Sequence, residues 1–227
     1  STQTDFPAAN SKMNYFKWCT NITIRNCRVQ NVGVPFKFAM CEVVNAYDNH
    51  LTYALIGLYA EGDTTTGGTE KCKYINYTGN YVDYYVYALE VKLADHCVIT
   101  NNFVGENVEK ATVDNAWHYG VSAVGGQDAA GYCKDIVITD NVILAAGDGG
   151  VVFYGVEKGQ CSGNIIKGSN TDGVIAFGRD IAIVNNDVSD SAEAGIKVGT
   201  YSTVPSSTST YFNVSENKVQ ECGGEGV

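Results

Sequence analysis

Three acidic residues recur at a nearly constant interval in the second half of the chain. Asp148 and Asp172 each stand directly before a glycine, and Glu193 stands two residues before one. On neighbouring turns of a repeating fold such carboxylates would lie about 5 Å apart, and on alternate turns about 10 Å apart. Acid pairs at these separations cleave glycosidic bonds, because their repulsion raises the pKa of one member and keeps it protonated. We therefore predict that these three residues are catalytic; the alternative is that an acid before glycine only forms a turn.

Polar and aromatic side chains also gather in segments that interrupt the repeat. Trp and Tyr rings can stack on sugar rings, while Asp and His can bond hydroxyl groups or move protons. The alternative for Trp117 is that it only anchors a long loop. Insertions that begin at residues 61, 125 and 199 are expected to leave from one edge of the fold, where insertions often build a binding face. The predicted substrate-binding residues are Asp114, Trp117, His118, Tyr119, Glu61, Asp63 and Tyr201.

A short repeated phrase must position these residues. Apolar residues fall five and three positions before an anchor residue and two positions after it, as Ile136, Ile138 and Ile143 do around Asn141. The repeat length is about 22 residues, extended by insertions, which is typical of a solenoid. The anchors are Cys27, Asn49, Asn80, Asn102, Asn141, Asn164, Asn186 and Asn217.

The apolar positions alternate with the period of a β-strand, and glycines separate them: the chain has 25 Gly and 3 Pro. This pattern predicts an all-β fold, a single-stranded right-handed parallel β-helix of about eight coils. Residues 1–18 are expected to be an N-terminal cap or a preceding coil, and residues 19–227 the β-helix, truncated at its C-terminal end. The anchor asparagines are expected to bond to one another along the axis and to supply the left-handed backbone of a tight bend.

The cysteines follow the same register. Cys19, Cys41, Cys72 and Cys133 each lie eight residues before an anchor, so they are expected to form an inward-facing column. Stacked parallel side chains are poorly oriented for a disulfide, and buried cysteine acts as a small apolar residue. We predict eight free thiols and synthesis in a reducing compartment. The chain has no paired Cys-x-x-Cys motif, so we expect no zinc, no other metal and no cofactor.

Net charge and hydropathy restrict the partners. The formal charge of −10 argues against nucleic acid, because a nucleic-acid binder needs Lys and Arg to displace counterions. No apolar run is long enough for a membrane span, and no signal peptide is recognisable, so no membrane insertion is expected.

The repeated phrase resembles that of the pectin-lyase-like right-handed parallel β-helix superfamily across residues 19–227. Within it, Asn170-Thr171-Asp172-Gly173 resembles one motif of the polygalacturonases, but the Gly-His-Gly motif of that family is missing. The Arg-rich motif expected of pectate lyases is missing too, since Arg25, Arg28 and Arg179 are the only arginines.

The remaining resemblance is to phage tailspikes and related tail fibres. It implies a homotrimer on a virion tail, made in the bacterial cytoplasm, that recognises bacterial surface polysaccharide with or without endo-cleavage by a hydrolase or lyase reaction. Two alternatives stay open. One is a non-catalytic structural or receptor-binding fibre module, and the other is a secreted polysaccharide lyase, hydrolase or epimerase.

Overall fold

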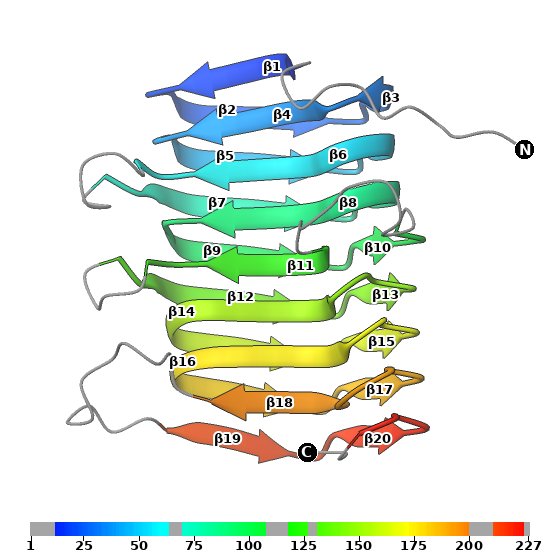
Figure 1. The fold of residues 1–227 in the computed structure, drawn as a ribbon. Coiled ribbons are helices and arrows are strands. Elements are labelled where there is room, and N and C mark those ends of the chain that lie inside the picture. The colour runs from blue at the N-terminus through cyan, green and yellow to red at the C-terminus, as the bar shows by residue number, and fades with distance from the viewer. Residues whose placement is uncertain (1–11, 64–69, 108–117, 127–130, 200–210, 225–227) are drawn as a thin grey trace, which may run out of the picture.

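The chain forms a parallel β-helix in which each strand pairs with strands one coil away (Figure 1). In this computed structural model the described residues are 12–63, 70–107, 118–126, 131–199 and 211–224. The secondary-structure elements within them are all strands. They stack in three faces that run along the solenoid axis, as the sequence pattern predicts.

Face 1 contains the residues before each anchor, face 2 those directly after it, and face 3 the third segment of each coil. The long strands β6, β8, β14 and β16 turn a corner and contribute to two faces. Face 1 consists of β2 (Thr20–Arg25), β5 (Glu42–Tyr47), β7 (Cys72–Thr78), β9 (Ala94–Thr100), β12 (Cys133–Thr139), the second parts of β14 (Gly149–Ser162) and β16 (Asp172–Val184), and β19 (Phe212–Ser215). Face 2 consists of β3 (Arg28–Val32), the first parts of β6 (His50–Glu61) and β8 (Tyr81–Lys92), and β10 (Phe103–Val104), β13 (Val142–Leu144), β15 (Ile165–Lys167), β17 (Asp187–Ser189) and β20 (Lys218–Gln220). Face 3 consists of β1 (Lys12–Lys17), β4 (Val34–Ala39), the later parts of β6 and β8, β11 (Tyr119–Val124), the first parts of β14 and β16, and β18 (Ile196–Gly199).

Alternation along each strand separates an apolar interior from the outer surface. On face 3, for example, Leu89 and Val91 are fully buried in the core, so Glu90 between them points outward. Inward positions stack in columns along the axis, and their side chains form one continuous core cluster. A second, smaller cluster of Tyr119, Val152 and Ile175 lies on the outer side of face 3.

The anchor asparagines form the predicted ladder. Asn141 donates from Nδ2 to Oδ1 of Asn164 at 3.0 Å, and its own Oδ1 accepts from Nδ2 of Asn102 at 2.9 Å. The same bond continues through the column to Asn217. At the other end, the Cys27 backbone N–H donates to Oδ1 of Asn49 at 3.0 Å. Only a backbone donor is needed there, so cysteine can replace asparagine.

The prediction that the anchors themselves adopt left-handed angles was wrong. The positive φ belongs to the residue before each anchor, such as Asp140 at 56° and Gly163 at 66°. This division has a physical reason: the anchor side chain must point inward to reach its neighbours in the ladder, and the preceding residue makes the bend. Asp, Asn and Gly tolerate that conformation best.

The glycines nine residues past an anchor serve a different purpose, which is close approach between coils. A Cβ on Gly150 would lie 2.3 Å from Cγ2 of Ile166 and 2.7 Å from the carbonyl oxygen of Gly173. Gly173 in turn leaves room for the carbonyl of Gly195, at 2.6 Å from a built Cβ. The recurring Gly in the sequence therefore marks a steric limit at the start of face 3.

All eight cysteines are free thiols, and five of them are buried. The inward column is confirmed for Cys41, Cys72 and Cys133, while Cys19 is partly buried against the core. Burial raises the pKa of Cys72 to about 11 and that of Cys133 to about 12. These thiols are therefore protonated at neutral pH and pack as small apolar side chains.

The predicted common edge of the insertions is confirmed by the residues that flank them. Glu61, Val124 and Gly199 end strands of face 3 and lie in one column of paired positions. These strand ends all lie at the left of Figure 1. At the N-terminus, β1 pairs with β4 and so forms a further rung of face 3.

Candidate functional site

The three predicted catalytic acids border one groove on the outer side of face 3. They stand where β14, β16 and β18 begin, so the stacking of the coils brings them to the same edge. The groove has a volume of about 320 Å³. Its lining residues are Asp148, Thr171, Asp172 and Glu193 together with Tyr154, Ile175, Phe177 and Lys197.

Asp148 is buried and holds the neighbouring coil in place. Its Oδ2 accepts a hydrogen bond from the backbone N–H of His118 at 2.8 Å, and its own N–H donates to the carbonyl of His118 at 2.6 Å. The Thr171 hydroxyl donates to the Asp148 carbonyl. These hydrogen bonds engage the carboxylate and the backbone of Asp148 with the coils on both sides of it.

Asp172 links two coils and an ammonium group. Its Oδ1 accepts from the Ala194 N–H at 3.0 Å, and its Oδ2 lies 3.1 Å from Nζ of Lys197. The hydrogen bond from Lys197 to Asp172 is the main reason why the pKa of Lys197 is raised. Glu193 is exposed and lies 3.8 Å from the same ammonium group. Lys197 and Glu193 are the groups at this end with most freedom to meet a ligand.

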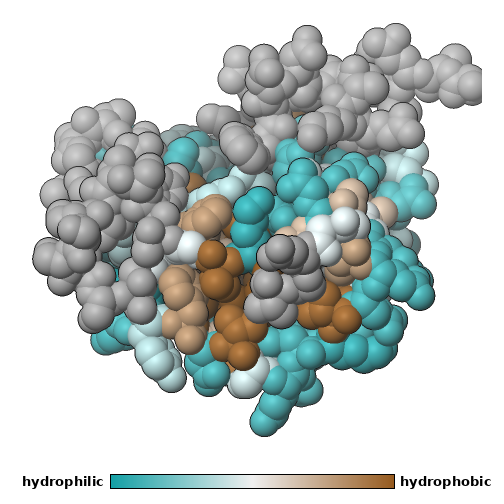
Figure 2. Space-filling model, turned by 60° about the horizontal axis from the view of Figure 1, so that its bottom comes forward, coloured by the Kyte–Doolittle hydropathy of each residue, from teal (hydrophilic) through white to brown (hydrophobic). Residues whose placement is uncertain are grey.

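A line of aromatic rings runs beside the acids along face 3. Tyr154 and Phe177 stack with centroids 5.4 Å apart and an interplanar angle of 22°. Tyr119 approaches Tyr154 at 6.1 Å and Tyr87 at 5.9 Å. Figure 2 turns the C-terminal end of the solenoid forward and shows hydrophobic residues in the middle of the view with hydrophilic ones around them; tyrosine, whose ring ends in a polar hydroxyl, is not among the hydrophobic residues of its colour scale. Tyr87, Tyr154 and Phe177 are partly exposed, and such rings beside polar groups suit a ligand with an apolar ring face and hydroxyl edges.

The other predicted binding residues are dispersed. His118 and Tyr119 are buried next to the groove, His118 through its bonds to Asp148 and Tyr119 within the outer cluster. Glu61 and Asp63 lie at the opposite end of face 3. Asp114, Trp117 and Tyr201 lie outside the described residues.

Glu61 is the centre of a group of charges. Its carboxylate lies 2.5 Å from Nζ of Lys37 and 3.7 Å from Nζ of Lys92. Burial acts to raise the pKa of Glu61, but the hydrogen bonds from Lys37 and Tyr59 outweigh it and leave this pKa below its usual value. Glu61 is therefore firmly ionised.

Glu90, which is not one of the predicted site residues, lies directly beside this group. It pairs with Tyr59 on one side and with Ser122 on the other, and it is only 8% exposed. Burial raises the pKa of Glu90 to about 7. In the sequence, Glu90 reads as an ordinary outward position between two apolar ones, so no local signal could have found it.

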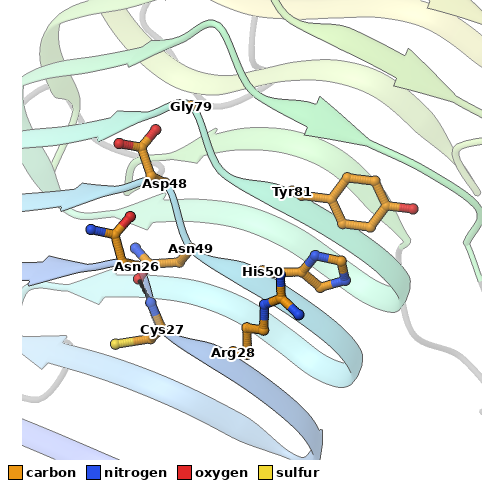
Figure 3. A pocket seen from close by; sticks show the side chains of 8 residues that line it. All are labelled: Asn26, Cys27, Arg28, Asp48, Asn49, His50, Gly79 and Tyr81. Atoms are coloured by element: carbon orange, nitrogen blue, oxygen red, sulfur yellow. Dashed lines mark hydrogen bonds between the residues drawn. The ribbon is translucent and has the colours of Figure 1, made fainter.

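A second hollow lies at the corner between faces 1 and 2, with a volume of about 450 Å³ (Figure 3). The fold explains the side chains around it. The ring centroids of His50 and Tyr81 are 4.5 Å apart, and those of Tyr81 and Phe103 are 5.1 Å apart. Each ring is therefore stacked on a neighbouring ring. Asn49 belongs to the ladder, and Asp48 makes the left-handed bend before it. We assign no ligand to this hollow.

Neither a metal centre nor a membrane-spanning helix is found in the part of the chain that the structure describes. No group of three or more His, Cys, Asp and Glu side chains there is arranged to hold a metal ion. Likewise, none of these residues forms a helix long and apolar enough to cross a membrane.

Comparison with known proteins agrees with this architecture. A family model described as the right handed beta helix region matches residues 97–227, which is more than half of the 227-residue chain. Searches of curated proteins and of solved structures found no match. The chain therefore belongs to the family of right-handed β-helix proteins.

Proposed function

We propose that this chain is a polysaccharide-recognising module that binds a glycan in the groove on face 3. The observation that carries the proposal is the stacked pair Tyr154 and Phe177 beside Asp172, Glu193 and Lys197. The rings offer flat apolar surfaces, and the carboxylates and the ammonium group offer acceptors and donors for sugar hydroxyls. Membership of the β-helix family is consistent with proteins that bind or cleave polysaccharides.

The charge of the module favours a neutral glycan. The chain carries a formal charge of −10, and the groove brings three carboxylates together with one lysine. A polyanionic polysaccharide would be repelled by this field. We therefore expect the glycan to be uncharged, or nearly so, where it meets the groove.

The finer proposal is a tailspike-like module of a homotrimer on a virion tail. Eight free thiols agree with synthesis in a reducing cytoplasm, and the common edge of the insertions agrees with one recognition face. The principal alternative is a fibre module without catalysis. It is favoured by the hydrogen bonds that already engage Asp148 and Asp172.

Replacing Tyr154 or Phe177 with alanine is expected to weaken glycan binding at least tenfold. Each change removes a ring face, and about 1.4 kcal/mol corresponds to that factor. The measurement is binding to an array of neutral and acidic bacterial surface polysaccharides. Tyr74→Ala is the matched control, because Tyr74 is 51% exposed but lies on face 1. Unchanged binding by both groove variants, or no bound member of the array for the wild type, would refute the proposal.

Endo-cleavage is a second candidate activity, supported by the position of three acids in one groove. If these acids cleave the glycan, the wild type releases reducing ends from a bound polysaccharide. The triple variant Asp148→Asn, Asp172→Asn, Glu193→Gln then loses this release at least a hundredfold, since acid–base catalysis contributes about 10² to 10⁴. Undiminished release by the triple variant would exclude these residues as catalysts.

A further inference from the structure

We propose that Glu90 and Ser122 form a second sugar subsite on face 3, which binds hydroxyl groups of the same neutral glycan. The inference rests on the proposed function and extends it along the solenoid axis. Glu90 and Ser122 occupy paired positions on β8 and β11, and both point outward because the residues on either side of them belong to the core.

Both side chains are buried and still have hydrogen-bonding capacity to offer. Glu90 is 8% exposed and Ser122 is 1% exposed. Within the described part of the chain, no hydrogen bond to the Ser122 hydroxyl is found, nor any hydrogen bond or ion pair of the Glu90 carboxyl. A buried polar group without a partner costs about 1 to 3 kcal/mol, which a bound hydroxyl group would recover. The Ser122 hydroxyl is such a group, and the Glu90 carboxyl lies at the paired position beside it, so together they indicate a place for a polar ligand.

The surroundings favour an uncharged partner. Tyr59 and Glu61 of β6 face Glu90. Lys92 and Tyr87 lie on the same strand as Glu90, and Lys37 of β4 lies beyond Tyr59. Lys37 and Lys92 are already engaged by Glu61. Burial raises the pKa of Glu90 to about 7, so this carboxyl is largely protonated below neutral pH. A protonated carboxyl can donate a hydrogen bond as well as accept one. A sugar hydroxyl does the same.

The aromatic line connects this subsite with the groove. Tyr87 lies on the strand of Glu90, Tyr119 lies on the strand of Ser122, and the rings continue through Tyr154 to Phe177. Glu90 and Ile175 are three rungs apart in one outward column, a distance of about 14 Å. A short oligosaccharide that lies over the rings would therefore reach from the groove to Glu90.

The test measures array binding at pH 6 and pH 8 for the wild type, Glu90→Gln and Ser122→Ala, with the neutral and acidic bacterial polysaccharides as probes. We expect the wild type to bind neutral members about tenfold more weakly at pH 8, because one pH unit above the pKa leaves about a tenth of Glu90 protonated. Glu90→Gln keeps a donor at every pH, so its binding should not change between the two values. Ser122→Ala should bind more weakly at both pH values and keep the pH dependence.

The outcomes separate this inference from the proposed function. If Tyr154→Ala abolishes binding while Glu90→Gln and Ser122→Ala match the wild type in affinity and pH dependence, the subsite is wrong and the groove stands. If the wild type binds only acidic polysaccharides, the neutral class of ligand is wrong. If it binds no member of the array, both proposals fail.

Discussion

Asn141→Ala is expected to lower the free energy of unfolding by about 3 to 5 kcal/mol. Asn141 is fully buried and donates from Nδ2 to Asn164, Ile99 and Thr139 at 2.9 to 3.0 Å. Its Oδ1 also accepts two bonds from Asn102. Alanine removes these bonds and leaves buried partners on both neighbouring coils unsatisfied. Urea unfolding, followed by circular dichroism, measures the loss.

Asn217→Ala is the matched control for this prediction. Asn217 makes equivalent bonds to Ile183 and Ser215 but is only partly buried, so water can replace some of them. Its loss should cost about half as much or less. If the two variants were equally stable, or if Asn141→Ala unfolded like the wild type, the ladder would not be the stabilising element that its geometry indicates.

Glu90→Gln is expected to change the free energy of unfolding in a pH-dependent way. The change should be more stabilising at pH 8 than at pH 4.5, by about 3 kcal/mol. The pKa of Glu90 is about 7 in the folded protein against 4.5 for the ordinary side chain. Between these values the folded state binds more protons than the unfolded state, so the contribution of Glu90 to stability falls as the pH rises from 4.5 to 7. Above pH 7 the fold carries the full cost of a buried charge. Glutamine removes that cost because it does not ionise.

The measurement is the difference in unfolding free energy between variant and wild type at several pH values, since this difference cancels the other titrating groups. Glu42→Gln is the control, because Glu42 is exposed at the start of β5. A difference for Glu90→Gln that does not change with pH would mean that Glu90 ionises normally and that its surroundings are well hydrated.

The sequence was sufficient to predict the fold because the repeat fixes the register of every coil. The Asn ladder, the inward cysteines and the common edge of the insertions all follow once Asn141 and its equivalents are aligned. The residue that makes the left-handed bend was misplaced by one position. Asn is suited to both roles, and only the geometry shows that Asp140 or Gly163 bends while Asn141 or Asn164 bonds.

The candidate site was only partly predictable. The stacking of Asp148, Asp172 and Glu193 at one edge follows from their spacing, whereas the bonds of Asp148 to His118 depend on how an inserted segment returns to the coil. Glu90 was missed for a related reason. Glu90 is buried although it points outward, and a period-two pattern contains no information about what covers the outer side of a strand.

The most direct test of the account is a crystal structure of this chain with a neutral oligosaccharide selected on the polysaccharide array. The account predicts sugar rings against Tyr154 and Phe177, with hydroxyl groups within hydrogen-bond distance of Asp172, Glu193 or Lys197. A glycan bound instead on face 2 beside His50 and Tyr81, or on the outer side of face 1, would contradict it.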